Sequence, residues 1–264
     1  MTADSKRKVY NIFHEAGRKC LAPVLFAGAV ANQFPGLFKK RGIRTRELFY
    51  YLDLCGTKSV PVAALICFLM GAVLGLQAAL QMRKVGTEIF VVDLVGFAVL
   101  KEFGPLMVTM ISTGRAASAF AAEIGTMKVN EEISALETMG ISSIAYLVYP
   151  KLLAMLAALP LLAVIGDACG ILGGMMVGLS LDIPFSAYWT RTITVLDGIT
   201  FLLGIAKTLV FSVLITLAGC YCGFRSASDA QGVGRGATNA VVLSIFLVVV
   251  ADAVITLLYS FIGY

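Results

Sequence analysis

Charged residues are scarce in this sequence. Only 14% of its 264 residues are Asp, Glu, Lys or Arg, whereas about a quarter of a soluble domain is charged. The few charges are clustered, and the apolar runs between them exceed the roughly 20 residues that a membrane-spanning helix needs. A soluble globular domain is therefore excluded. The short alternating segments of a membrane β-barrel are also missing.

Residue types that bind metals or perform catalysis are also rare. The chain has one histidine, His14, and its six cysteines lie mostly in or beside apolar runs. Cys220 and Cys222 lack the spacing of zinc ligands, so packing is the favoured role for these thiols. No Gly-x-x-x-x-Gly-Lys-Ser/Thr phosphate loop is present. The sequence therefore predicts neither an enzyme nor a chain that binds ATP, a metal or another cofactor itself.

Five apolar segments are long enough to cross a bilayer, and they predict an all-α integral membrane protein with five transmembrane helices. The third segment carries Gly166, Gly170, Gly174 and Gly178, a stripe on one face that allows close helix packing. A similar pair, Gly71 and Gly75, lies in the first segment. The expected spans are about residues 60–82, 89–112, 150–179, 199–222 and 240–261.

Residues 1–58 differ from the rest because they hold eleven of the 21 basic residues. Their apolar stretch, residues 21–31, is interrupted or followed by prolines and amides, so it is not expected to span. A basic segment with apolar patches suits an interfacial helix at the cytoplasmic lipid surface; a mobile basic tail is the alternative. Residues 59–264 are expected to form one membrane domain with five spans.

The basic residues also predict the orientation. With the amino terminus in the cytoplasm, sixteen of them lie on the cytoplasmic side and three on the outer side, as the positive-inside rule requires. The carboxyl terminus then faces outward. Residues 113–149 form a cytoplasmic loop, and residues 180–198 form an outer loop with interfacial aromatics.

Several charges fall inside the expected spans. Each would cost about 2.5–3.5 kcal/mol at the bilayer centre, so each should face a partner or a wet cavity. Lys207 can pair with Asp252 or with Glu102. One polar cluster that meets the head group of an amphiphile is expected, and a structural ion-pair lock between helices is the alternative. The charges are Lys101, Glu102, Asp167, Lys207 and Asp252, of which all but Asp167 are expected in the cluster.

The cytoplasmic loop has the pattern of an amphipathic helix. Asn130 is expected to cap it, acidic residues occupy its first turn and Gly140 ends it. Its acidic side would face a soluble partner, or the helix would simply cover the bundle. The apolar face consists of Ile133, Leu136 and Met139.

This loop resembles a known family. Residues 114–140 closely resemble the signature of the MlaE/YrbE permeases, the membrane subunits of Mce-associated ABC transporters. The likeness extends from about residue 45 to the end of the chain. Further similar stretches are residues 73–77, 100–105, 146–150, 205–211 and 232–238.

The resemblance implies a homodimeric, five-span permease with an N-terminal interfacial helix in a bacterial inner membrane. It implies phospholipid transport between the inner and outer membranes, which maintains outer-membrane lipid asymmetry. The implied partners are a cytoplasmic ABC ATPase of the MlaF type, which binds ATP and magnesium, a STAS-domain protein of the MlaB type, and an outer ring of Mce-domain proteins of the MlaD type. No nucleic acid is implied.

The resemblance also assigns roles to residues. A coupling helix after the second span, about residues 123–139, would contact the ATPase. The implied substrate-binding residues are Leu76, Gln77, Leu80, Lys101, Glu102, Lys207 and Asp252. The implied ATPase-coupling residues are Arg115, Glu123, Thr126, Met127, Lys128, Glu131, Glu132 and Glu137.

Two other functions fit the residues. An ion-coupled secondary transporter would use Glu102, Asp167 and Asp252 as a proton relay. A scaffold without transport activity would only assemble the outer ring. A sterol-like cargo is a variation of the permease hypothesis.

Overall fold

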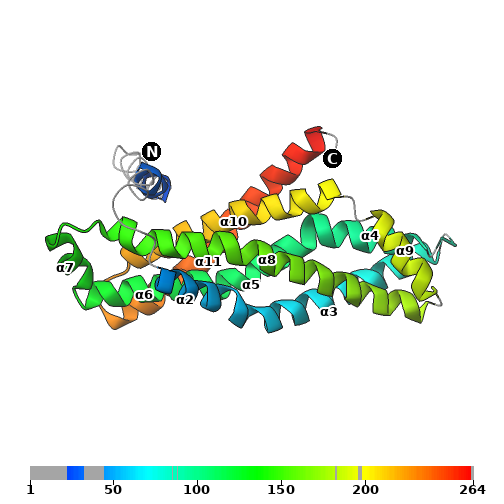
Figure 1. The fold of residues 1–264 in the computed structure, drawn as a ribbon, viewed down its shortest axis with the longest axis horizontal. Helices are drawn as coiled ribbons and strands as arrows, with labels where there is room; N and C mark the ends of the chain where they lie inside the picture. Colours follow the sequence, from blue (N-terminus) through cyan, green and yellow to red (C-terminus); the bar gives the residue numbers. More distant parts are fainter. Residues whose placement is uncertain are drawn as a thin grey trace, which may run out of the picture.

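The computed structural model describes residues 23–32, 45–84, 86–87, 89–181, 183–195 and 198–262. Five of its helices are long and apolar enough to cross a membrane, which confirms the expected class and number of spans. They form an elongated bundle (Figure 1). The five spans are Thr45–Met82, Phe90–Val129, Ser143–Ser180, Gly198–Phe224 and Ala230–Phe261.

The first span is longer than expected. It consists of α2 (Thr45–Cys55), a short 3₁₀ turn η1 (Thr57–Ser59) and α3 (Val60–Met82). Helix α3 has the predicted bounds, and it begins with a proline in its first turn, where a missing backbone N–H costs nothing. The helical chain nevertheless starts before residue 58, where the N-terminal segment was expected to end.

A short apolar helix, Pro23–Asn32, precedes this span. The ring of Phe26 packs against those of Tyr221 and Phe224, with centroids 5.9 Å away in each case. The hydroxyl of Tyr149 donates a hydrogen bond of 2.8 Å to the carbonyl of Val30. These contacts hold the short helix on the bundle; its contact with lipid stays a prediction. The other residues up to 44 lie outside the described part of the chain.

The second span extends from Phe90 to Val129, past its expected end at residue 112. It consists of α4 (Phe90–Ala98), η2 (Val99–Phe103), α5 (Gly104–Ser112), η3 (Thr113–Ala117) and α6 (Ser118–Val129). The segments η2 and η3 are π-helical turns. Pro105, the second residue of α5, cannot donate a backbone hydrogen bond, so the wider turn lies where the regular ladder is interrupted.

The amphipathic helix expected between Asn130 and Gly140 is present, but residues 123–139 do not form the one continuous helix that the resemblance implied. The chain breaks between α6 and α7 (Glu132–Thr138), because Glu131 adopts a left-handed conformation with φ of 60°. Asn130 does not cap α7: its backbone N–H bonds to the carbonyl of Thr126 at 3.0 Å and so completes α6. The predicted end is confirmed, since Gly140 follows α7 with φ of +71°, a conformation that glycine adopts readily.

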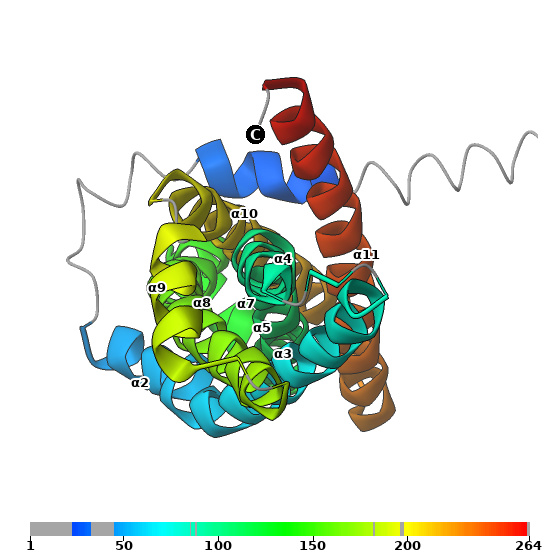
Figure 2. The same ribbon diagram turned by 90° about the vertical axis from the view of Figure 1, so that its right-hand side faces the viewer.

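The last three spans are α8 (Ser143–Ser180), α10 (Gly198–Phe224) and α11 (Ala230–Ile262), and α9 (Phe185–Val195) connects α8 to α10. Helices α8 and α11 begin earlier than expected, at 143 rather than 150 and at 230 rather than 240, so much of the expected loop is helix. Helix α7 lies at one end of the bundle and α9 at the other (Figure 1). We call these the α7 end and the α9 end. Figure 2, viewed from the α9 end, shows α11 at the edge of the bundle.

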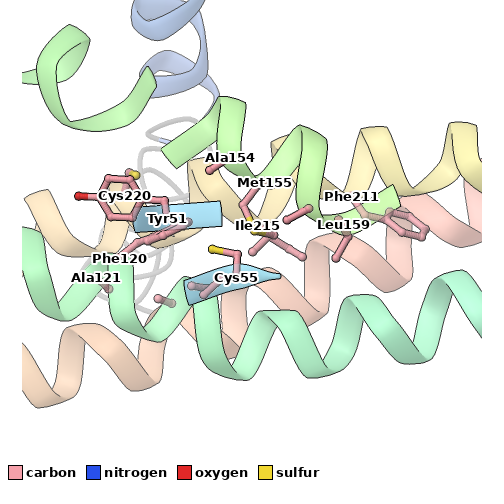
Figure 3. Close-up of a cluster of buried hydrophobic side chains, with 14 of the residues drawn as sticks. Tyr51, Cys55, Phe120, Ala121, Ala154, Met155, Leu159, Phe211, Ile215 and Cys220 are labelled. Atoms are coloured by element: carbon pink, nitrogen blue, oxygen red, sulfur yellow. The ribbon is translucent and has the colours of Figure 1, made fainter. Parts of the chain in front are cut away.

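The glycine stripe allows α8 to pack closely, as predicted. A methyl group on Gly71 of α3 would overlap the backbone of Gly170, and one on Gly173 would overlap the carbonyl of Phe68. Gly178 lies against the ring of Tyr188 in α9. Small residues therefore bring α3 and α8 into backbone contact and let the ring of Tyr188 pack on α8. A buried cluster also joins α8 to α2, α6 and α10 (Figure 3); its members include Tyr51, Phe120, Met155, Leu159, Phe211 and Ile215.

Candidate functional site

Lys207 is the centre of a polar cluster inside the spans. Its Nζ donates to Glu102 Oε2 at 2.7 Å, to Asp252 Oδ1 at 3.0 Å and to Thr256 Oγ1 at 2.9 Å. The hydroxyl of Thr256 donates in turn to Glu102 Oε1 at 3.0 Å. An ammonium group has three protons to donate, and all three are used here. The second, fourth and fifth spans are thereby joined at one point.

Both pairings expected for Lys207 are therefore present together. The side chain of Lys207 is completely buried, whereas those of Glu102 and Asp252 are 30% and 19% exposed. The exposed part of the cluster therefore belongs to Glu102, Asp252 and Thr256, and the buried cation orients both carboxyl groups. Two carboxyl groups share one ammonium, so the cluster has an excess of hydrogen-bond acceptors.

Lys101 does not join this cluster, contrary to expectation. Its Nζ lies over the ring of Phe97, 4.9 Å from the centroid. Consecutive residues of a helix point in directions about 100° apart, so Glu102 and Lys101 cannot both face Lys207. The π-helical turn that contains both residues is of a type frequent at functional sites.

Asp167 also lies apart from the cluster. It is 5% exposed in α8, and its Oδ1 has no hydrogen-bond partner among the described residues. This oxygen is in contact with Gly104, the first residue after the π-helical turn, where a methyl group would overlap it. Asp167 thus packs against the segment that presents Glu102, and its place in a proton relay with Glu102 and Asp252 stays a prediction.

The three predicted first-span residues line an exposed face of α3. Leu76 is 52% exposed and Leu80 69%, and Gln77 is exposed beside them. No contact joins them to Lys207 among the described residues. A role for this face in binding substrate stays a prediction.

The predicted coupling residues divide into two groups. Thr126, Glu131, Glu132 and Glu137 are exposed at the α7 end, so this end has an acidic surface that a partner can reach. Their role in contacting an ATPase stays a prediction. Ser143 donates a 3.2 Å hydrogen bond to Glu137 there.

The remaining coupling residues, Arg115, Glu123, Met127 and Lys128, are only partly exposed and contact the protein itself. Lys128 Nζ donates to the carbonyls of Phe224 and Ser226 at the end of α10, at 3.0 and 2.7 Å. Arg115 donates to the carbonyl of Lys58, and Met127 packs against the core.

Glu123 takes part in a network that the sequence did not predict. Its Oε1 accepts hydrogen bonds from Tyr51 at 2.5 Å and from Lys151 at 3.1 Å. Lys151 has no exposed side-chain surface, although the sequence placed it at the cytoplasmic surface. One signal was available, since Lys151 is followed by a long apolar run. Thr256, four residues after Asp252, was also missed, although this spacing puts both on one helix face.

The α9 end is held by another ion pair. Arg191 donates from Nε and Nη2 to the two carboxyl oxygens of Asp93, at 2.8 and 2.7 Å, a bidentate geometry. The hydrogen bond and charge of Asp93 raise the pKa of Arg191, and burial raises the pKa of Tyr188 to about 12. Tyr188 is therefore neutral at physiological pH, and α9 is fixed to α4 and α8.

Five membrane-spanning helices around an internal polar cluster, with an acidic surface at one end, define a polytopic membrane protein of the transporter type. The sequence profile of the family "Permease MlaE" matches residues 48–258. The chain therefore belongs to the MlaE permease family.

Named relatives agree with this membership. A probable ABC transporter permease protein of Rickettsia bellii is 39% identical over 205 residues, which cover 77% of this chain and 79% of the relative. The intermembrane phospholipid transport system permease protein MlaE of Haemophilus influenzae is 27% identical over 252 residues, 95% of this chain and 94% of the relative. The Arabidopsis thaliana protein TRIGALACTOSYLDIACYLGLYCEROL 1, chloroplastic, is 28% identical over 86% of this chain and 65% of its own length. These relatives are transport subunits where their names state a function.

Proposed function

We propose that this chain is the permease subunit of an ABC transporter that moves phospholipids between the inner and outer membranes of a bacterial cell and so maintains outer-membrane lipid asymmetry. The observation that carries the proposal is the Lys207 cluster, an ion network inside the spans of an MlaE-family chain. Buried charges at this depth are costly unless they serve a pathway or a partner. The name of the Haemophilus relative supports phospholipid as the cargo.

In this proposal the carboxyl groups of the cluster meet the lipid head group. All three protons of the Lys207 ammonium are donated within the chain, so it orients Glu102 and Asp252 and does not bind the lipid phosphate itself. The carboxyl groups of the partly exposed Glu102 and Asp252 side chains accept hydrogen bonds from a head group with donors. The outward-facing residues of α3, Leu76, Gln77 and Leu80, contact the acyl chains.

A separate ATPase supplies the energy. The acidic surface formed by Glu131, Glu132 and Glu137 supports a docking site at the α7 end, which is then cytoplasmic. Sixteen basic residues against three support this orientation, which puts the carboxyl terminus in the periplasm. Two copies of the chain, two ATPase subunits of the MlaF type, a STAS-domain protein of the MlaB type and an outer ring of MlaD-type Mce proteins complete the transporter.

The experiment that tests this proposal is native mass spectrometry of the tagged protein, gently extracted from its own host. We expect a homodimer that copurifies with an ATPase and an Mce protein and retains phospholipid. A dimer without an ATPase would contradict the proposal and would favour an ion-coupled transporter that uses Glu102, Asp167 and Asp252. A complete complex that carries a sterol-like molecule would contradict only the cargo.

A charge reversal tests the docking surface separately. Glu131→Lys with Glu132→Lys reverses two exposed side chains that no core contact requires, so the dimer should fold normally. We expect it to lose the copurifying ATPase. The matched control is Asp53→Lys, which reverses an exposed carboxyl group on α2. If the double variant still copurified with a fully active ATPase, the surface would be misassigned.

A further inference from the structure

Three helices meet at one partly buried hydrogen-bonded network near the α7 end. Lys151 of α8 donates to the hydroxyl of Tyr51 in α2 at 2.9 Å and to Glu123 of α6 at 3.1 Å. Tyr51 donates to the same oxygen of Glu123 at 2.5 Å. Each residue contacts both of the others, and each comes from a different helix. We call these three residues the Tyr51–Glu123–Lys151 network.

The surroundings of this network exclude water from its cation. The side chain of Lys151 has no exposed surface, and its Nζ lies 4.4 Å from the ring centroid of Tyr51 and 5.8 Å from that of Phe120. The two rings pack edge to face, at one end of the buried apolar cluster in Figure 3. Glu123, whose side chain is 34% exposed, is the anionic partner of this buried cation. Removing one partner of a buried pair leaves an uncompensated charge, so α6 cannot move away from α2 and α8 without a large penalty.

The network lies between the acidic surface and the spans. Glu123 is in α6, which ends at Val129 and is followed by the break at Glu131 and by α7. Tyr51 is in α2, which runs through η1 into α3 and so leads to the exposed face at Gln77. Lys151 is near the start of α8, which packs closely on α3. A displacement of α6 and α7 is therefore passed to the first and third spans at this point.

We propose that Tyr51, Glu123 and Lys151 are positioning residues that carry movement of the α6–α7 segment into the first and third spans. This inference rests on the proposed function, because it takes the α7 end as the side where the ATPase docks. The network binds neither lipid nor nucleotide. It keeps the three helices in one relative position, so that a displacement of the exposed helix α7 also displaces α3.

The proposed positioning role also explains why charged residues, and not apolar ones, lie at this contact between the helices. Neighbouring contacts between the same helices are apolar, and apolar residues of similar volume can replace a buried ion pair without loss of stability. Stability alone therefore does not require the charges. Directional hydrogen bonds to a single oxygen of Glu123 define one relative position of the helices, whereas apolar side chains can slide past one another.

The test neutralises the pair without leaving a lone charge. The variant Glu123→Gln with Lys151→Met removes both charges and nearly conserves volume. The complex purified from the host membrane is reconstituted in vesicles of phosphatidylethanolamine and phosphatidylglycerol. ATP hydrolysis and transfer of a fluorescent phosphatidylethanolamine are measured together, and their ratio is the number of lipids moved per ATP.

We expect the double variant to retain its ATPase subunit and to hydrolyse ATP within about twofold of the wild type, while the lipids moved per ATP fall about tenfold. The matched control is Asp53→Asn with Lys58→Gln, which neutralises an ion pair of 3.0 Å whose side chains are 47% and 54% exposed. This control should leave the ratio unchanged. A merely structural role would lower assembly and hydrolysis together and would not change the ratio.

A second variant decides the outcome if the first does not assemble. Tyr51→Phe keeps the ion pair between Lys151 and Glu123 and removes only the bridging hydroxyl, so the chain should fold. We expect the lipids moved per ATP to fall about threefold. The inference would be overturned if the double variant moved as many lipids per ATP as the wild type. If the double variant does not assemble, the same result in Tyr51→Phe would overturn it. If the wild-type complex moved no lipid with ATP, the proposed function would fail instead.

Discussion

Lys207 has a position that no other residue type fills equally well. It donates to two carboxyl groups and a hydroxyl from a fully buried position. We predict that Lys207→Met destabilises the protein by about 3 kcal/mol, because Glu102 and Asp252 then face each other without a cation. The measurement is the thermal unfolding midpoint in lipid nanodiscs.

The control for this prediction is Lys207→Met combined with Glu102→Gln. The second change removes one of the unpaired carboxylates, so we expect much of the stability to return while lipid transport stays low. If Lys207→Met alone unfolded at the temperature of the wild type, the cluster would contribute nothing to stability.

Gly104 lies where a side chain cannot fit, because Asp167 Oδ1 occupies the space and the carbonyl of Val99 lies 3.0 Å from the position of a Cβ atom. We predict that Gly104→Ala lowers the free energy of unfolding by about 1–3 kcal/mol and displaces the turn that presents Glu102. Denaturant unfolding of the purified chain in detergent checks this.

The matched control is Gly114→Ala in the second π-helical turn, where no atom lies within 4 Å of the added methyl group. Alanine is favoured over glycine in helices, so this variant should be as stable as the wild type or more so. Equal destabilisation by both alanines would show that the contact with Asp167 is unimportant.

At the scale of elements, α9 has two different faces. Tyr188 and Thr192 are buried against the bundle, whereas Phe185, Trp189 and Ile193 are 55%, 50% and 56% exposed. The rings of Phe185 and Trp189 stack with centroids 6.2 Å apart. A helix that connects two spans and has such a face suits the lipid interface, where tryptophan is enriched.

We predict that Trp189 contacts lipid. It is the single tryptophan of the chain, so the intrinsic tryptophan fluorescence reports on this position alone. Lipids brominated near the head group should quench it strongly in reconstituted bilayers, whereas acrylamide in water should quench it weakly. Trp189→Phe is the control for background emission. Strong acrylamide quenching without lipid quenching would place this face in water.

The helices were predictable where a single property of consecutive residues determines them. Apolar length alone located α3 correctly, and the spacing of the glycines anticipated the close packing of α8. Helix ends were predicted poorly, since the second span continues through polar residues such as Arg115 to Val129. Side chains buried against other helices stabilise α6, so the helix does not end where the apolar run ends.

At the scale of the whole molecule, α7 and α9 lie at opposite ends of the long axis (Figure 1). We predict opposite accessibility for cysteines introduced at Glu132 and at Thr190, which are exposed at these two ends. A membrane-impermeant maleimide should label the first only in inside-out vesicles and the second only in intact spheroplasts. The described native cysteines should give little background, because Cys55, Cys67, Cys220 and Cys222 are buried and Cys169 is only partly exposed.

The wild-type chain, treated in the same way, measures labelling of the native thiols. If both introduced cysteines were labelled from the same side, the two ends could not lie on opposite faces of the membrane, and the orientation derived from the basic residues would be wrong. The ATPase docking surface would then need another position.

The membrane class, the five spans and the membership of the MlaE permease family could all be read from the amino-acid sequence. Apolar length and a contiguous signature are local properties, and they can be read without knowing which helices meet. The charges inside the spans could be identified in the same way. Glu102, Lys207 and Asp252 were noticed because a charged side chain within an apolar span has a high free-energy cost in lipid.

The pairing of these groups could not be read from the sequence and became visible in the folded chain. Folding brought Lys207 to both carboxyl groups, turned Lys101 toward Phe97, and placed Glu123 against Tyr51 and Lys151. Such pairing depends on the rotation and register of helices that are far apart in the sequence. Those are set by close packing of small residues and by buried contacts, which no single segment contains.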